Sequence, residues 1–206
     1  MKGVTLVSGG LDSTLMCLLL KERNVEQIPV FINYGQLALE NEWNTCKNVF
    51  QSLTLPNPIQ VNLEGYGNTI KSGITDKAKH VSEEAFLPGR NMLFLLVGAA
   101  ISRHHGGTFV SIGLLSEEFS LFPDQRSQFI KSMERTLELA LGGHIIILTP
   151  LSEFSKVDSI ILAKEMGMDI EKSYYCHQGS NIPCGNCISC KERIDAMKII
   201  NQKEVI

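Results

Sequence analysis

Hydrophobic and polar positions along the chain alternate between two periods, and this alternation predicts the secondary structure. Short continuous apolar runs rich in β-branched residues predict buried strands, here over residues 3–8, 27–35, 57–63, 107–115 and 142–151. Apolar positions three and four residues apart predict helices over residues 12–23, 37–53, 91–105, 123–141 and 155–167, and a last helix from about Ser189. The segment 91–105 is apolar nearly all round, so we expect a buried helix there, opened by Pro88.

Strands and helices of these lengths in alternation predict an α/β fold with a doubly wound parallel sheet. In such sheets, ligands bind outside the carboxyl ends of the strands. Residues 64–87 form the only long stretch without a predicted element, and stretches of this kind are often lids or binding loops.

The composition is that of a soluble globular protein and excludes few functions. The chain has 206 residues, 44% hydrophobic and 20% charged, which fits one domain with a small appendage. A net charge of −3 argues against a strongly basic nucleic-acid surface. The sequence shows no signal-peptide pattern, and its apolar runs are too short to span a bilayer, so we expect a cytosolic protein.

The stretch SGGLDS, residues 8–13, separates the first strand from the first helix. Backbone N–H groups in a tight glycine-rich turn, together with the positive end of the following helix, bind anions such as phosphate. Ser8 and Ser13 can donate hydrogen bonds, and Asp12 would repel phosphate, so a bound Mg²⁺ is its natural partner. The alternative is a turn that only ends the strand, with Asp12 or Ser13 capping the helix.

Cysteines gather near the end of the chain with the spacing C-x7-C-x2-C-x2-C, at Cys176, Cys184, Cys187 and Cys190. Disulfides are rare in the cytosol, and this spacing suits a closed tetrahedral Cys₄ zinc site with a structural role. The alternatives are free thiols, a redox pair or an iron–sulfur cluster, and His177 is a competing ligand. Cys17 and Cys46 lie in helical patterns and are best interpreted as small core residues.

Together these motifs resemble a known family. SGGLDS is similar to the pyrophosphate loop (PP-loop) of the N-type ATP pyrophosphatases, and the chain as a whole resembles QueC, the 7-cyano-7-deazaguanine synthase of queuosine biosynthesis. Further matching segments are INYGQ, LPGRNMLFL, FPD, TPL followed by Lys156, and the cysteine cluster. The resemblance implies an adenine nucleotide α-hydrolase-like PP-loop domain over residues 1–170 and a zinc-binding segment over 171–206. It also implies a homodimer.

The reaction that the resemblance implies consumes ATP. The carboxylate of 7-carboxy-7-deazaguanine attacks ATP and becomes an acyl-adenylate, and ammonia then displaces AMP to give the amide. A second ATP activates the amide oxygen, and elimination leaves the nitrile. Mg²⁺ would serve the phosphates, zinc would be structural, and membrane or nucleic-acid partners are not expected.

Candidate site residues follow from the matching segments. ATP and pyrophosphate would be bound by Ser8, Gly9, Gly10, Leu11, Asp12, Ser13, Tyr34, Gly35 and Gln36. Catalytic roles would fall to Asp12, Ser13, Arg90 and Lys156, and substrate contacts to Arg90, Asn91, Phe122, Asp124 and Arg126. Several of these residues have a structural alternative: a solvated lysine for Lys156, a helix-start contact for Arg90, a cap of the turn for Asn91, a strand-end turn for Tyr34–Gln36, and helix N-capping for Asp124.

The chain departs from the family pattern near the expected base pocket. Leu37 stands where QueC proteins usually have a basic residue, and SLFPDQ, residues 120–125, stands where they usually have SGYPDC. These departures raise a second hypothesis, a QueC-like paralogue that stops at the amide or joins the acid to another amine, such as a protein amino terminus in a bacterial defence system. A non-catalytic zinc-knuckle binding module and a tRNA thiolase of the same superfamily are further alternatives.

Overall fold

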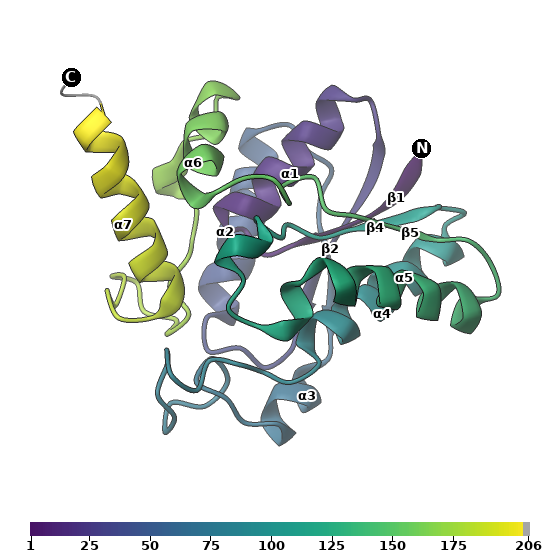
Figure 1. Cartoon of the computed structure of the whole chain (residues 1–206), viewed down its shortest axis with the longest axis horizontal. Coiled ribbons are helices and arrows are strands. Elements are labelled where there is room, and N and C mark those ends of the chain that lie inside the picture. The colour runs from purple at the N-terminus through teal and green to yellow at the C-terminus, as the bar shows by residue number, and fades with distance from the viewer. Residues whose placement is uncertain (204–206) are drawn as a thin grey trace.

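The computed structural model describes residues 1–203 and contains a five-stranded parallel sheet in the order β3-β2-β1-β4-β5 (Figure 1). The strands are β1 Lys2–Val7, β2 Glu26–Asn33, β3 Ile59–Asn62, β4 Phe109–Ser111 and β5 Ile146–Leu148. The chain winds outward from β1 to β3, then returns to place β4 on the other side of β1, where Gly3 pairs with Phe109. This arrangement confirms the predicted α/β class and its doubly wound sheet.

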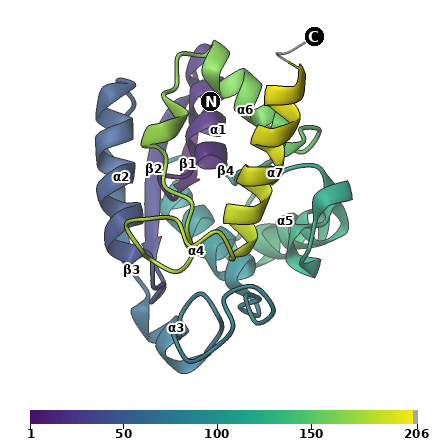
Figure 2. The same ribbon diagram turned by 90° about the vertical axis from the view of Figure 1, so that its left-hand side faces the viewer.

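Helices cover both faces of the sheet (Figures 1 and 2). They are α1 Leu11–Glu22, α2 Leu39–Ser52, α3 Glu64–Thr69, α4 Arg90–His104, α5 Ser127–Leu141, α6 Lys156–Glu165 and α7 Ile188–Lys203, with short 3₁₀ turns at Glu117–Phe119, Pro123–Gln125 and Ile170–Lys172. None of the helices in residues 1–203 combines the length and the apolar character that a bilayer-crossing helix needs.

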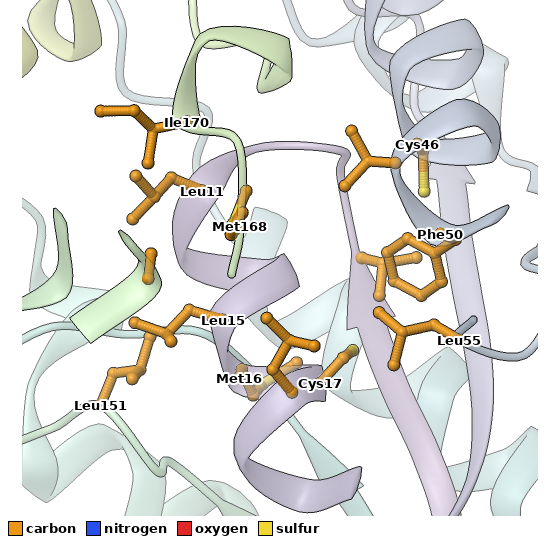
Figure 3. Packing of buried hydrophobic residues seen from close by; sticks show 14 of the residues in the cluster. Leu11, Leu15, Met16, Cys17, Cys46, Phe50, Leu55, Leu151, Met168 and Ile170 are labelled. Atoms are coloured by element: carbon orange, nitrogen blue, oxygen red, sulfur yellow. The ribbon is translucent and has the colours of Figure 1, made fainter. Parts of the chain in front are cut away.

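The two faces of the sheet have separate hydrophobic cores. One core joins α1, α2, α6 and α7, with Leu15, Phe50, Ile160 and Ala196 buried in it. Figure 3 shows part of this core, where Cys17 and Cys46 lie among aliphatic and aromatic side chains. The other core joins α4 and α5 to the sheet. Both cysteines are fully buried, which confirms their interpretation as core residues.

Helix α4 is less buried than its sequence predicts. Met92 is 48% exposed and Leu96 is 39% exposed, so one side of an almost uniformly apolar helix faces outward. The helix begins at Arg90 and not at Pro88, because Gly89 adopts a left-handed conformation (φ +75°) that breaks the backbone path just before it. The carbonyl of Pro88 instead accepts a hydrogen bond from the Tyr66 hydroxyl.

Residues 64–87 are folded and pack against the turn that follows β2. They contain the short helix α3, and Ile74, Ala85 and Leu87 are buried in the same core as α4. The backbone N–H of Leu37 donates to the carbonyl of Ile74 over 2.9 Å. This segment therefore forms a packed wall next to the end of β2.

Several predicted elements are shorter or divided. The predicted helix 123–141 begins with a 3₁₀ turn and becomes α-helical only at Ser127, and the predicted strand 142–151 contains three residues of β5. Helix α7 packs on α6, and its Ala196 and Ile200 join the core of α1 and α2. The division at residue 170 into two units stays a prediction.

Candidate functional site

The SGGLDS loop lies at the carboxyl end of β1 and leads into α1. Gly9 needs its left-handed conformation (φ +77°), and a Cβ there would lie 2.7 Å from the Glu42 carbonyl oxygen of α2. The N-cap of α1 is Gly10, which offers no side-chain cap, so the alternative that Asp12 or Ser13 caps this helix is wrong. The N-terminus of α1 therefore keeps backbone donors that can bind an anion.

Hydroxyl groups brace the loop from within. The Ser8 N–H donates to Ser13 Oγ over 3.2 Å, and Ser13 Oγ donates to the Gly10 carbonyl over 3.2 Å. Ser8 Oγ also accepts from the Gly10 N–H over 3.3 Å. These bonds hold the turn in the shape that the glycines permit.

Asp12 and Lys156 form an ion pair at the mouth of the loop, with 2.6 Å between Asp12 Oδ2 and Lys156 Nζ. Lys156 is the first residue of α6, and the N-cap residue Ser155 forms a reciprocal cap with Asp158. The buried Asp12 Oδ1 has no hydrogen-bond partner among the described residues. A carboxylate with a free buried oxygen beside an anion-binding loop fits a Mg²⁺ ligand.

Tyr34, Gly35 and Gln36 follow β2 as a hydrogen-bonded turn. Gln36 Oε1 accepts from the Tyr34 N–H over 2.9 Å, and Gln36 Nε2 donates to Glu42 Oε2 over 3.0 Å. Tyr34 and Gln36 line the cavity beside the SGGLDS loop, which we call the main cavity. Gly35 instead packs against the Glu64 carbonyl oxygen, which would lie 2.9 Å from an added Cβ.

Arg90 and Asn91 open α4 and have different environments. The Arg90 guanidinium lies 5.9 Å from the ring centres of both Tyr34 and Phe94, inside the main cavity. Asn91 is buried, and its side-chain amide donates to the backbone carbonyl of Asp124 over 3.1 Å. This structural hydrogen bond occupies one of the donors of the Asn91 amide.

Asp124 does not cap the helix that follows it in sequence. It lies in the 3₁₀ turn, and its Oδ2 accepts from the backbone N–H of Asn91 over 3.3 Å, so it stabilises the first turn of α4. Its buried Oδ1 has no partner within residues 1–203. Phe122 lines a smaller neighbouring cavity, while Arg126 is exposed and lines neither cavity.

The main cavity has a volume of about 270 Å³ and is lined by most of the residues predicted to bind the nucleotide. It is lined by Ser8, Gly10, Leu11, Asp12, Ser13, Tyr34, Gln36, Arg90, Asn91 and Lys156. Its wall also contains residues that the sequence did not single out for this role: Glu42, Tyr174, Tyr175, His177, Ser189 and Arg193. All but Glu42 come from the cysteine segment or α7, which fold back over the loop. No local sequence motif predicts that these residues would pack beside the loop.

The cysteine segment, residues 174–190, contacts both the SGGLDS loop and the start of α2. The Tyr174 N–H donates to the Gly9 carbonyl over 3.3 Å, and Asn41 Nδ2 donates to the Gly179 carbonyl over 2.9 Å. A Cβ on Gly179 would lie 2.2 Å from the Leu37 carbonyl oxygen. The segment therefore lies flush against the N-terminal part of α2 and closes one side of the cavity.

Cys176, Cys184, Cys187 and Cys190 place their sulfur atoms within 4.8 Å of one another, and all four are free thiols. The Sγ atoms of Cys184 and Cys190 are 3.9 Å apart. Zn–S bonds of about 2.3 Å put the sulfurs of a tetrahedral site roughly 3.8 Å apart, so the four thiols fit such a metal. Among the described residues, the group of side chains that could hold one metal ion contains these four cysteines and not His177. The His177 Nε2 atom instead lies 2.9 Å from Ser189 Oγ.

Burial changes the acidity of several groups in and around the cavity. It raises the pKa of Glu42 to about 7, against the smaller opposing effects of the Gln36 hydrogen bond and the Arg90 charge. It lowers the pKa of His177 to about 4, and the charges of Arg90 and Lys156 act in the same direction. Burial also raises the pKa of Cys17 and Cys46 to about 12, which makes them poor nucleophiles and disfavours the thiolase alternative.

Comparison with known proteins assigns the family. Residues 2–201 match the family model described as "Queuosine biosynthesis protein QueC". The chain belongs to the QueC family. Over its whole length it is 30% identical to the 7-cyano-7-deazaguanine synthase of Sulfurovum sp. (strain NBC37-1), covering 97% of that protein.

Solved structures show that the QueC fold seen here is shared more widely. A predicted tRNA methyltransferase subunit from Methanocaldococcus jannaschii aligns with a TM-score of 0.55 at 17% identity, over 84% of this chain and 92% of that one. A 4-thiouridine synthetase, solved as an RNA complex with bound ATP, aligns with a TM-score of 0.53 at 19% identity, over 99% of this chain and 51% of that one. These likenesses support the α/β fold of the PP-loop type.

Proposed function

We propose that this QueC-family protein uses ATP to convert 7-carboxy-7-deazaguanine and ammonia, through an acyl-adenylate and an amide, into 7-cyano-7-deazaguanine. The observation that most supports this is one cavity containing the SGGLDS loop, the Asp12–Lys156 pair and Arg90 together. Family membership and the full-length synthase relatives agree with it.

The cavity offers the charge pattern that adenylation requires. The donors of the loop and the N-terminus of α1 would bind the departing pyrophosphate. Lys156 and Arg90 would neutralise the negative charge that develops when the acid's carboxylate attacks the α-phosphorus. Holding the two anionic substrates close together is the other contribution of the site.

Two metals fit residues in this chain. Mg²⁺ would be held by Asp12 and would supply charge neutralisation for the phosphates of ATP. Zinc would be held by Cys176, Cys184, Cys187 and Cys190 as a structural ion, since four thiolates leave no position for a substrate. A homodimer and a cytosolic location stay predictions.

In the proposed sequence, each activation breaks the bond between the α- and β-phosphates of ATP. The acid's carboxylate oxygen bonds to the α-phosphorus as pyrophosphate leaves. Ammonia then forms the C–N bond and loses one proton while the C–O bond to AMP breaks. A second ATP activates the amide oxygen, and loss of AMP and two protons from that adduct gives the nitrile. One nitrile therefore requires two ATP molecules and releases two AMP and two pyrophosphate.

Mass spectrometry of the products tests this proposal. The purified protein is incubated with ATP, Mg²⁺, ammonium and 7-carboxy-7-deazaguanine, and the expected product is the nitrile, with AMP and pyrophosphate. Amide alone, or AMP without nitrile, would contradict nitrile formation and favour the paralogue that stops early or uses another amine. Absence of pyrophosphate release would favour the non-catalytic binding module.

A further inference from the structure

A second cavity of about 180 Å³ adjoins the main one on the side of residues 114–125. The two share part of their lining, including Asp12, Arg90, Gly113, Gln125, His177 and Ser189. If ATP occupies the main cavity with its phosphates on the SGGLDS loop, a second substrate that must reach the α-phosphorus has to lie at this junction. Residues common to both cavities are therefore the ones placed to contact the acid.

Two of the shared residues, Asp12 and His177, have a buried side-chain atom without a partner among the described residues, and Asp12 Oδ1 is already assigned to Mg²⁺. The His177 Nε2 atom lies 2.9 Å from Ser189 Oγ, while the buried Nδ1 of the same ring has no partner in the part of the chain that the structure describes. A buried polar atom left without a partner costs about 1–3 kcal/mol, so such atoms are usually satisfied by a ligand or water. The Ser189 hydroxyl can either donate to the ring or accept from it, and thus fixes its orientation.

The cysteine cluster holds this pair in place from both ends. His177 directly follows Cys176, and Ser189 directly precedes Cys190. The two side chains therefore reach the junction from a short, tightly turned segment, which suits a contact that has to recognise a rigid planar substrate.

We propose that His177 determines substrate specificity by hydrogen-bonding the heteroaromatic acid through Nδ1, and that Ser189 is a positioning residue that orients the His177 ring. This inference rests on the proposed function, because it places the acid beside ATP in the shared part of the cavities. It assigns the cysteine segment a part in acid recognition in addition to its metal.

The test compares two substitutions that preserve different atoms of the ring. An asparagine amide reaches the position of Nδ1, whereas a glutamine amide reaches the position of Nε2. His177→Gln should raise the KM for 7-carboxy-7-deazaguanine about tenfold, the loss expected for one hydrogen bond, with the KM for ATP within about twofold of wild type. His177→Asn should lie closer to wild type than His177→Gln.

Ser189→Ala tests the positioning role. It should raise the KM for the acid by about threefold in the wild type but add little to His177→Gln, because it acts through the ring. Ser189→Thr, which restores a hydroxyl, should recover most of the loss. Gln178→Ala, an exposed position beside His177, is the matched control, and metal content measured on every variant should be unchanged.

The outcomes separate this inference from the proposed function. Turnover by the wild type with equal KM for the acid in all His177 variants would overturn the inference alone, as would a parallel rise in the KM for ATP. Failure of the wild type both to convert the acid and to bind it in calorimetry with a non-hydrolysable ATP analogue would overturn both. If the wild type binds 7-carboxy-7-deazaguanine but does not convert it, the acid is titrated into the same variants by calorimetry. Equal affinities in all of them would again overturn the inference.

Discussion

Asp12 has one carboxylate oxygen on Lys156 and another that is buried without a partner in the described chain. Asp12→Asn should lower pyrophosphate release by about 10²–10³-fold, because an amide neither neutralises Lys156 nor ligates Mg²⁺ as a carboxylate does. The ion pair is partly exposed, because 21% of the Lys156 side chain and 25% of the Asp12 side chain are accessible to solvent. The melting temperature should therefore move by only a few degrees. A pyrophosphate-release assay and a thermal melt measure both quantities.

Asp195→Asn is the matched control for this change. Asp195 also pairs with a lysine, Lys198, over 2.9 Å, but both side chains are exposed on α7 and outside the two cavities. It should turn over like wild type. Undiminished pyrophosphate release by Asp12→Asn would remove Asp12 from the site.

Glu42 makes stability depend on pH. Burial raises its pKa from an ordinary 4.5 to about 7, so the folded protein binds this proton more tightly than the unfolded chain does. The stabilisation is complete below about pH 4.5 and is lost as the pH rises through about 7. Relative to Glu42→Gln, the wild type should therefore lose on the order of 2 kcal/mol of unfolding free energy between about pH 5 and pH 7.5.

Urea unfolding at several pH values measures this difference. Glu40→Gln removes an exposed acid two residues away on α2 and should leave the pH dependence of the wild type unchanged. Parallel pH profiles for the wild type and Glu42→Gln would show that the buried carboxyl does not titrate in this range.

The strands, most helices, the glycine loop and the cysteine cluster could be predicted from the sequence because each leaves a local pattern. SGGLDS sits between a β-branched run and an apolar helix, and the cysteine spacing fixes a ligand set without reference to the rest of the fold. The left-handed Gly89 that starts α4 late, and the packed segment 64–87, depend on contacts with distant residues. For the same reason, the positions of Tyr174, His177 and Arg193 in the cavity could not be predicted.

The docking of the cysteine segment on α2 gives an element-level prediction. A methyl group at Gly179 would meet the Leu37 carbonyl oxygen at 2.2 Å and strain a backbone at φ +74°, so Gly179→Ala should push the segment away from the loop. We expect ATP affinity to fall about tenfold, which corresponds to 1.4 kcal/mol, with the metal retained. Equilibrium binding of ATP and elemental analysis provide the two measurements.

Gly185→Ala is a control that separates the steric clash of an added Cβ from the backbone strain of a positive φ. Gly185 has a similar φ of +72° in the same segment, but nothing lies within 4 Å of an added Cβ. It should share the conformational cost of about 1 kcal/mol and keep normal ATP affinity. Equal ATP affinity in the two variants would mean that docking of the segment does not shape the nucleotide site.

The molecule as a whole joins its first loop to its last helix through the cysteine segment. Tyr174 contacts the loop, α7 packs on α6, and α6 supplies Lys156 to Asp12. The cysteine segment thus contacts the loop of the proposed ATP site directly and is connected to α6 through α7. Loss of the proposed metal should affect folding and nucleotide binding together, since metal-binding free energy in such segments contributes to folding.

Cys187→Ser tests this coupling. It should lose the metal and, if about 3 kcal/mol of stability goes with it, melt roughly 6–12 °C lower, with weaker ATP binding. Cys17→Ala is the control, because Cys17 is equally buried but belongs to the core of α1, so this variant should keep a full complement of metal. A Cys187→Ser protein that is free of metal yet as stable as wild type would refute a structural metal, and one that binds ATP normally would show that the segment keeps its position without it.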